Sequence, residues 1–259
     1  MDESTADQLR PQFGGATLAT ALTAHLREAI MDGRLPPGAK LHLEELRAAF
    51  GVSLSPLREA LSRLSIEGLV VSEDQKGYRV APVSLGNFDE VTQLRVMLET
   101  LALTKAIGQG DMSWEVALLS ASHRLGRLEG PHGKGEPIEN WELAHREFHN
   151  ALIGASRMPL LVEMCGRLHD LSDRYRRIFL GERPFDRDVA GEHRAIMEAT
   201  LKRNGRKACA LLQQHIERTA NNIKPILAKR LAPAEAKADA GGRRRGRAAL
   251  SPPGAAKRR

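Results

Sequence analysis

The sequence lacks the features that mark secreted and membrane-spanning proteins. It contains only two cysteines, Cys165 and Cys209, which lie far apart in helical contexts and fit a reducing compartment as buried, apolar thiols. No apolar run approaches the roughly eighteen residues that a membrane span needs, and the first thirty or so residues show no signal-peptide pattern. We therefore expect a cytoplasmic protein with no membrane partner.

Outside its C-terminal tail the chain is not basic, although the whole chain carries a net charge of +7. Residues 229–259 contain ten Lys/Arg and two acidic residues, which is a charge of +8, so the rest of the chain stands at −1. This tail is rich in Ala, Gly, Pro and Arg and cannot bury enough apolar surface to offset its ordering entropy, so we expect it to be disordered. The tail would either bind phosphate groups weakly or aid solubility. Its charge alone therefore identifies no partner.

Residues 17–82 predict a small winged helix-turn-helix domain that follows a flexible N-terminus, residues 1–16. Apolar residues at helical spacing indicate three helices, over residues 17–32, 43–50 and 56–69. Two short β-rich runs, 70–71 and 78–80, enclose a polar turn and indicate a hairpin. A generic protein-binding α+β domain would show the same element order.

Turn residues set the boundaries within this domain. Pro36-Pro37-Gly38 cannot continue the first helix. Ser53 or Ser55 can cap the third helix, and Pro56 directly after Ser55 occupies the favoured first helical position.

From residue 83 to 228 the pattern is helical throughout, without internal repeats or heptads. Gly- and Pro-containing breaks divide it into six helices, over residues 84–107, 112–128, 138–154, 158–180, 186–203 and 206–227. The fold class is therefore mainly α, with an N-terminal winged helix and a C-terminal all-helical bundle of about six helices.

Two sets of motifs together resemble a known family of regulators. The stretches LREAIMDGRLPPGAKL, GVSLSPLREALSRLSIEGLV and KGYRV resemble the winged helix of the GntR family, nearly position for position. Further along, LRVMLETLALTKAI, HREFHNALI, EHRAIMEATLKRN and ALLQQHI are similar to the FadR-type (FCD) effector domain. SPLREALS and HREFH also resemble the family's regulators of glutarate and γ-aminobutyrate use.

The resemblance implies a bacterial DNA-binding transcriptional regulator, most often a repressor, that acts at the nucleoid. It implies a homodimer on double-stranded DNA with an inverted-repeat operator, because one small winged helix reads only a few base pairs. It also implies a small organic acid as the effector that modulates operator binding.

By the same resemblance, the residues that face DNA lie at the start of the third helix and at the wing tip. They are Ser53, Ser55, Arg58, Lys76 and Gly77. The family commonly has Arg-Thr where Leu54-Ser55 stands here, so one usual base-reading arginine is absent. Arg47, at a position where a small residue is usual, can supply replacement charge.

Four of the nine histidines form a pattern of their own. His145 and His149 are four residues apart on one helix, a spacing that lets two imidazoles chelate one cation, and His193 and His215 lie on later helices. From spacing alone, surface or hydrogen-bonded core histidines explain the pattern more readily than a metal site does.

The FCD resemblance implies that these histidines hold a divalent metal. Members bind metal through an Asp, a His four residues later and two later histidines, and His149, His193 and His215 match the three histidines. His145 stands at the Asp position, so the nitrogen-rich set favours zinc, with nickel as an alternative. His145 either joins the ligands or swings out and leaves open positions for water or effector.

Arg95 matches an arginine of the family that points into the same cavity, where a guanidinium beside a metal suits a carboxylate. The alternative is a solvated arginine paired with Glu99 at i+4. Two rival functions use the same histidines. One is a metal-responsive regulator, and the other is a metal-dependent hydrolase with Glu142, Glu147 or Glu192 as its base. HREFH is not the HExxH arrangement, and we expect no catalytic residues and no enzyme.

Overall fold

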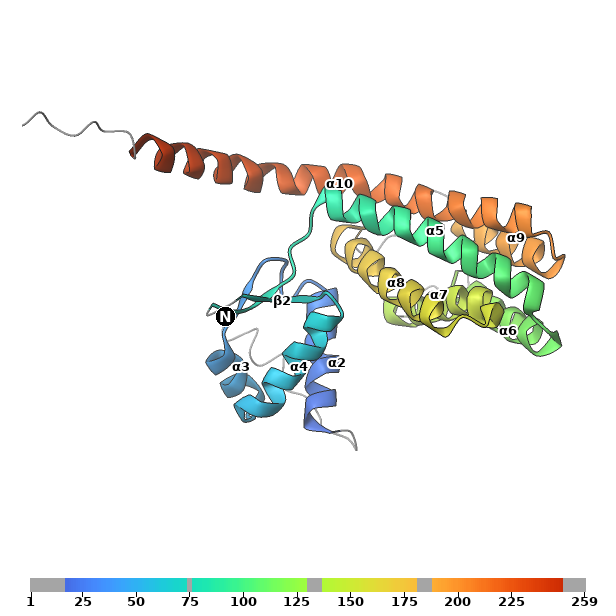
Figure 1. Ribbon diagram of the computed structural model, residues 1–259, viewed down its shortest axis with the longest axis horizontal. Coiled ribbons are helices and arrows are strands. Elements are labelled where there is room, and N and C mark those ends of the chain that lie inside the picture. Colours follow the sequence, from blue (N-terminus) through green and yellow to red (C-terminus); the bar gives the residue numbers. More distant parts are fainter. Residues whose placement is uncertain (1–16, 74–75, 130–136, 181–187, 249–259) are drawn as a thin grey trace, which may run out of the picture.

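The computed structural model describes residues 17–73, 76–129, 137–180 and 188–248. It forms two lobes, a small N-terminal one and an elongated helical bundle (Figure 1). The expected flexible residues 1–16 lie outside the described part of the chain. So do residues 130–136 and 181–184, which hold nearly all of two expected helix breaks.

The small lobe is a winged helix, as predicted. Its elements are α2 (Leu18–Met31), β1 (Lys40–Leu41), α3 (Leu43–Phe50), α4 (Leu54–Ile66), β2 (Val70–Glu73) and β3 (Gly77–Val80). β3 is the central strand of an antiparallel sheet of order β1-β3-β2, with Val70 opposite Val80 and Lys40 opposite Arg79. The sequence predicted only the β2–β3 hairpin, because a two-residue strand after a Pro-Pro-Gly turn is too short to show alternation.

Helix α4 begins earlier than the sequence suggested. Ser53, in an extended conformation, is its N-cap residue, although its side chain makes no capping hydrogen bond, and Leu54 is the first helical residue. Pro56 therefore stands at the third helical position rather than the first. A proline is tolerated at that position, because the first few backbone N–H groups of a helix have no intrahelical acceptor.

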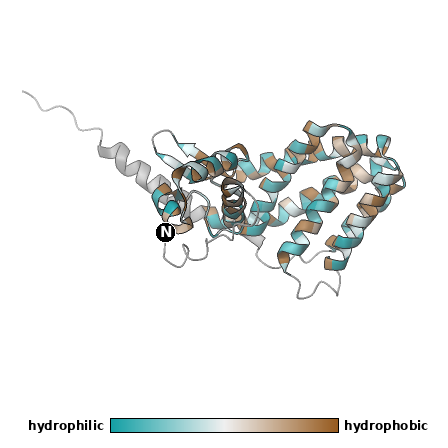
Figure 2. Cartoon of the chain, turned by 90° about the horizontal axis from the view of Figure 1, so that it is seen from below, coloured by the Kyte–Doolittle hydropathy of each residue, from teal (hydrophilic) through white to brown (hydrophobic). Residues whose placement is uncertain are grey.

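The core of the small lobe lies between α2 and α4. Leu22 and Leu26 of α2 and Leu57, Leu61 and Leu64 of α4 are all fully buried. Burial of a leucine contributes about 1.5–3 kcal/mol relative to its exposure, so these five side chains are a main source of the lobe's stability. Hydrophobic positions form stripes along the helices, while the opposite sides are hydrophilic (Figure 2).

The bundle contains the six helices that the sequence predicted. They are α5 (Leu85–Gln109), α6 (Met112–Glu129), α7 (Ile138–Ile153), α8 (Pro159–Leu180), α9 (Val189–Leu201) and α10 (Gly205–Ala248), with a 3-10 turn, η2 (Gly154–Ser156), after α7. Side-chain caps fix two of the starts: Ser84 accepts from the backbone N–H of Asn87, and Asp188 from that of Gly191. Leu103, Phe148 and Leu212 lie in its core.

The sequence placed the end of the last bundle helix near residue 227 and the start of the basic tail at residue 229. Helix α10 runs beside α5 and continues past the bundle to Ala248 (Figure 1). Ala, Arg, Lys and Glu favour a helix, whereas Pro233 and the glycines at 241, 242 and 246 oppose one. The disorder expected of this tail stays a prediction. Residues 249–259 lie outside the described part. Among the helices described, none combines the length and apolarity that crossing a bilayer requires.

Candidate functional site

The structure brings the four predicted histidines together at the centre of the bundle. His145 and His149 come from α7, His193 from α9 and His215 from α10. Each is at most 7% exposed, and one ring nitrogen from each lies within 4.8 Å of the others. Three helices therefore place four imidazoles around one point.

A carboxylate faces the Nδ1 atom of three of these rings. The pairs are His193 with Glu129 Oε1 at 2.7 Å, His215 with Glu192 Oε2 at 2.9 Å, and His149 with Glu99 Oε2 at 3.5 Å. An ionised carboxylate only accepts hydrogen bonds, so Nδ1 carries the proton and the Nε2 lone pair is left for a ligand. Metal-binding histidines are commonly oriented in this way.

His145 has a different environment. Its ring stacks on Trp141 of the same helix, with centroids 4.7 Å apart and planes at 17°, and its buried Nδ1 has no hydrogen-bond partner among the described residues. Burial, followed by the nearby His149 and His193, holds the pKa of His145 well below its usual value. The ring is therefore neutral and able to donate a lone pair.

The donor set fits a divalent metal. Nε2 of His193 and Nε2 of His149 are buried without a hydrogen bond inside the described structure, and each such atom costs about 1–3 kcal/mol unless a partner satisfies it. Neutral imidazole nitrogens suit zinc and nickel. Burial raises the pKa of the nearby Cys165 thiol to about 12, so this sulfur stays protonated and does not compete as a ligand.

Arg95 lies one layer behind His149 and is neither solvated nor among the candidate ligands. Its buried guanidinium donates from Nε to Glu99 at 2.7 Å, from Nη1 to Ser172 Oγ at 2.9 Å and from Nη2 to His169 Nδ1 at 3.2 Å. Burial opposes ionisation of Glu99, but Arg95 and then His149 outweigh it and lower the pKa of this carboxyl. Glu99 is thus a charged link between Arg95 and His149.

A fifth buried histidine, His169 of α8, joins this network without acting as a free donor. Because a guanidinium only donates, Nδ1 of His169 accepts from Arg95, and the ring proton sits on Nε2, which lies 3.4 Å from Asp173 Oδ2. His169 therefore holds Arg95 through Nδ1, while its Nε2 faces Asp173 without forming a hydrogen bond with a described residue.

The buried histidines predict how stability depends on pH. Burial lowers the pKa of His169 to about 3 and also lowers those of His145 and His149, so the folded protein keeps these rings neutral while the unfolded chain protonates them near pH 6.5. EDTA-treated protein should therefore lose stability as pH falls below about 6.5. The upper limit is about 1.4 kcal/mol per pH unit for each fully linked histidine.

Thermal melts between about pH 7 and pH 5 check this, since histidine is the side chain that ordinarily titrates in that window. His169→Gln should flatten the slope, whereas the matched change at exposed His123 of α6 should leave it unchanged. A melting temperature independent of pH would contradict neutral burial.

Three of the predicted DNA-facing residues lie at the start of α4. Ser53, Ser55 and Arg58 are exposed along the first turns of α4, and Arg58 makes no hydrogen bond or ion pair with any residue that the structure describes. Arg63, further along α4, is instead paired with Glu59 at 2.6 Å. A free cation at the start of a helix is available for phosphate or a base edge.

The other expected DNA contacts are on α3 and the wing. Arg47 is half exposed and pairs with Glu44 on its own helix at 2.8 Å, so its charge is partly neutralised. Lys76 is exposed at the wing tip. Gly77, with φ of 87°, opens β3 in a conformation that favours glycine. Residues 74 and 75 of the wing lie outside the described part.

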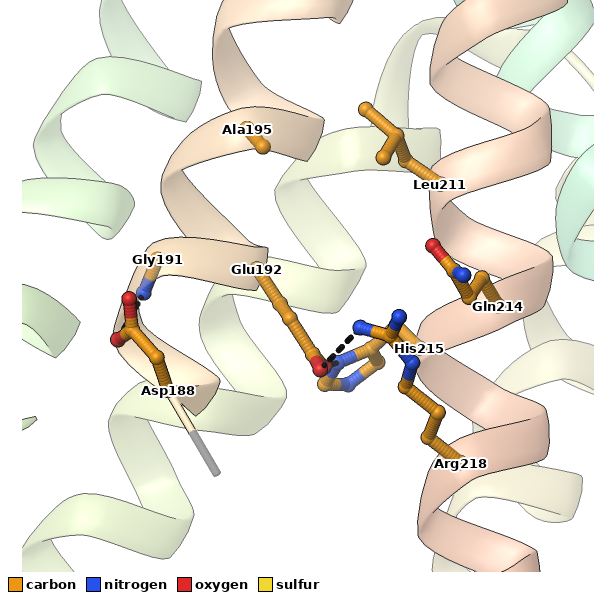
Figure 3. A pocket seen from close by; sticks show the side chains of 8 residues that line it. All are labelled: Asp188, Gly191, Glu192, Ala195, Leu211, Gln214, His215 and Arg218. Carbon is orange, nitrogen blue, oxygen red and sulfur yellow. Dashed lines mark hydrogen bonds and ion pairs between the residues drawn. The ribbon is translucent and has the colours of Figure 1, made fainter.

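A pocket of about 390 Å³ between α9 and α10 adjoins the histidine cluster (Figure 3). Ala195 and Leu211 form apolar parts of its wall, and His215 and Glu192 lie where it approaches the cluster. Arg218 Nη1 lies 3.0 Å from Glu192 Oε1, which places a second charged partner on the carboxylate that orients His215.

Sequence reasoning missed several residues of the site. Glu129 could not be found locally, because it lies at the end of α6 and meets His193 only through the fold. His169 and Asp173 do show a local signal: they stand four residues apart, as His145 and His149 do. Glu192, considered as a catalytic base, is held by His215 and Arg218 instead.

Comparison with protein families matches both lobes. The family of bacterial regulatory proteins of the gntR type matches residues 18–80, and the FCD domain matches residues 90–218. The second match contains all four histidines of the cluster and Arg95.

Similar proteins are transcriptional regulators, not enzymes. The HTH-type transcriptional regulator BphR of Paraburkholderia xenovorans (strain LB400) is 33% identical over 227 residues, covering 86% of this chain and 92% of its own. The HTH-type transcriptional repressor GlaR of Escherichia coli (strain K12) is 33% identical over 195 residues, covering 74% and 89%. The solved structure of E. coli McbR/YncC shares the fold, with a TM-score of 0.67 at 22% identity over 81% of this chain and 98% of that chain.

Proposed function

This chain belongs to the GntR family of bacterial regulatory proteins and is a DNA-binding transcriptional regulator with an FCD domain, and from that premise we propose that a small carboxylate, bound beside a divalent metal in the bundle, controls its operator binding. Its site of action would be the nucleoid in the cytoplasm. Repression is the proposed outcome, because a relative at 33% identity is named a repressor.

The observation that carries the proposal is the buried cluster of four histidines with three carboxylates at Nδ1. His149, His193 and His215 would hold the metal through Nε2, and His145 would be the fourth, less constrained ligand. Zinc is the proposed metal, with nickel as the alternative. When bound, such a metal acts as a Lewis acid that attracts a carboxylate oxygen.

Arg95 is the proposed partner of the effector carboxylate. Two of its three donor contacts go to neutral acceptors, Ser172 and His169, and hydrogen bonds to a charged acceptor are about twice as strong as neutral ones. A carboxylate entering beside His149 can therefore replace those acceptors while Glu99 keeps its contact with Nε.

Arg58 is proposed to read the operator, and Arg58→Ala should weaken specific binding by about 1–3 kcal/mol. The melting temperature should hardly change, because this side chain is exposed and unpaired among the described residues. Fluorescence anisotropy with an operator selected from random duplexes measures the loss. Arg63→Ala is the matched control with a smaller expected effect, and equal operator binding by Arg58→Ala and wild type across a salt series would refute this role.

We propose a homodimer that binds an inverted repeat. GntR regulators typically dimerise, and α5 and α8, which pack side by side, carry large exposed apolar side chains: Met97 is 65% exposed, Leu101 43%, Leu160 68% and Met164 46%. Surfaces of this kind mark protein interfaces. Sedimentation should give two chains per palindromic operator, and Met97→Glu with Leu160→Glu should shift the free protein toward monomer. One chain per operator would contradict the proposal.

The hydrolase alternative loses support from the positions of its candidate bases. Glu142 pairs with Arg176 and Arg177, and Glu147 pairs with Arg124 on the surface. Neither carboxylate faces the histidine cluster as a free base.

A thermal-shift screen of zinc-loaded protein against small carboxylic acids, glutarate included, tests the effector. A hit should raise the melting temperature and lower operator affinity in parallel, because a ligand stabilises the state that it binds. An operator affinity that follows zinc and ignores every acid would instead favour the metal-responsive regulator.

A further inference from the structure

Helix α8 is shared by the two lobes. On one side it contributes Ser172 and His169 to the Arg95 network behind the cluster. On the other side, Leu171 packs against the core of the winged helix, and Ile178 lies against Gly33 at the end of α2. A movement of α8 relative to the cluster would therefore reach the DNA-binding lobe.

A chain of ion pairs crosses from the ligand helix to the winged helix. Glu142 lies on α7, three residues before His145, and is buried. Its Oε1 atom is 3.0 Å from Arg176 Nη2, and Oε2 contacts Arg177. Arg177 also donates from Nη1 to Asp32 Oδ1 at 3.2 Å. Asp32 is the C-cap residue of α2, so the chain ends on the DNA-binding lobe.

The same ion pairs adjoin the ring of His145. This ring stacks on Trp141, and the guanidinium of Arg176 lies 4.8 Å from the centroid of the Trp141 indole. Arg176 is shared between Glu142 and Asp173. Because His145 stacks on Trp141, and Arg176 contacts both Trp141 and Glu142, a rotation of the His145 ring is expected to shift these groups as well.

We propose that Glu142 and Arg177 are positioning residues that make operator affinity respond to occupancy of the histidine cluster. The inference rests on the metal centre proposed above. A rotation of the His145 ring on metal binding would shift Glu142, which lies on the same helix face. Through the ion pairs Glu142–Arg177 and Arg177–Asp32, this shift would then reach the end of α2. Helix α2 packs against α4 and is joined to its end by the Arg27–Glu67 pair, so the DNA-reading helix follows.

The test compares operator affinity of EDTA-treated and zinc-loaded protein. Zinc alone is the probe, and an operator selected from random duplexes is the DNA. For wild type we expect the two dissociation constants to differ on the order of tenfold, within the usual range of allosteric coupling. Arg177→Met and Asp32→Asn should each reduce that ratio to about twofold or less, while zinc affinity stays at the wild-type value.

Arg34→Met is the matched control. Arg34 also pairs with Asp32, at 3.1 Å, but its other ion pair, with Glu28, lies within the winged helix as well. It should keep the wild-type ratio. The double variant Asp32→Asn with Arg177→Met should lose no more coupling than either single change, because both break one bridge. Asp32 is exposed, so its variant carries the test if Arg177→Met fails to fold.

The outcomes separate the inference from its premise. Failure of the wild type to bind zinc would overturn the proposed function. If wild type binds zinc and both single variants retain its operator response, the bridge is not the coupling route, although the metal centre stands. Zinc binding with no change in wild-type operator affinity would likewise overturn the inference, because the bridge would have nothing to transmit.

Discussion

Replacing His193 with alanine should weaken zinc binding by about 100-fold or more, because the change removes one of the four converging nitrogens together with its carboxylate support. Bound metal stabilises by mass action, about 2.7 kcal/mol at a concentration 100 times the dissociation constant. The rise in melting temperature that zinc produces in wild type should therefore vanish in the variant.

Operator binding by His193→Ala should persist at the level of the metal-free wild type, because the winged helix has its own core. Its response to zinc and to any carboxylate should be lost. Calorimetry and thermal melts of the same preparations measure both effects. His123→Ala, a change at an exposed histidine of α6, is the matched control and should bind zinc normally. Wild-type zinc affinity in His193→Ala would remove His193 from the site.

Glu129→Gln should lower zinc affinity by about 10- to 100-fold without any change to a ligand. Glu129 Oε1 lies 2.7 Å from His193 Nδ1. Glutamine keeps the size and an acceptor oxygen, but loses the negative charge that makes the imidazole a stronger donor. The loss should therefore appear in zinc affinity while the fold and operator binding remain.

Competition against a coloured zinc chelator measures that affinity. Glu147→Gln is the matched control, because Glu147 lies on α7 among the ligands in sequence but pairs with Arg124 at the surface. The zinc affinity of Glu147→Gln should equal that of the wild type. If Glu129→Gln and Glu147→Gln bind zinc equally well, the carboxylate does not tune the histidine.

Much of the site was predictable because its signals are local. The i, i+4 spacing of His145 and His149 defines one helix face, and the helices that carry His193 and His215 follow from apolar periodicity and Gly/Pro breaks. Their convergence on one point was implied only by the family resemblance, because spacing says nothing about which faces of separate helices meet.

The supporting groups were not predictable for the same reason. Glu129 on α6 contacts His193 on α9, and no sequence pattern around either residue predicts this contact. Arg95 shows the limit of a local pairing rule. The alternative interpretation made Arg95 and its i+4 partner Glu99 a solvated pair, yet both are buried, because His149, Ser172 and His169 surround them.

One fold feature was missed in the sequence interpretation because it depends on context. Strand β1 exists only by pairing with β3 and has no periodicity of its own. The end of the last helix was also placed too early, because α10 continues past residue 227 and Leu231 still packs against buried residues.

X-ray absorption at the zinc edge of zinc-loaded protein tests the central claim most directly. The account predicts one zinc per chain with nitrogen or oxygen neighbours at about 2.0–2.1 Å and outer-shell scattering from at least three imidazoles. His193→Ala should lose this signature. A shell with sulfur at about 2.3 Å, or one without imidazole scattering, would contradict it, because the metal would then be bound elsewhere than at His149, His193 and His215.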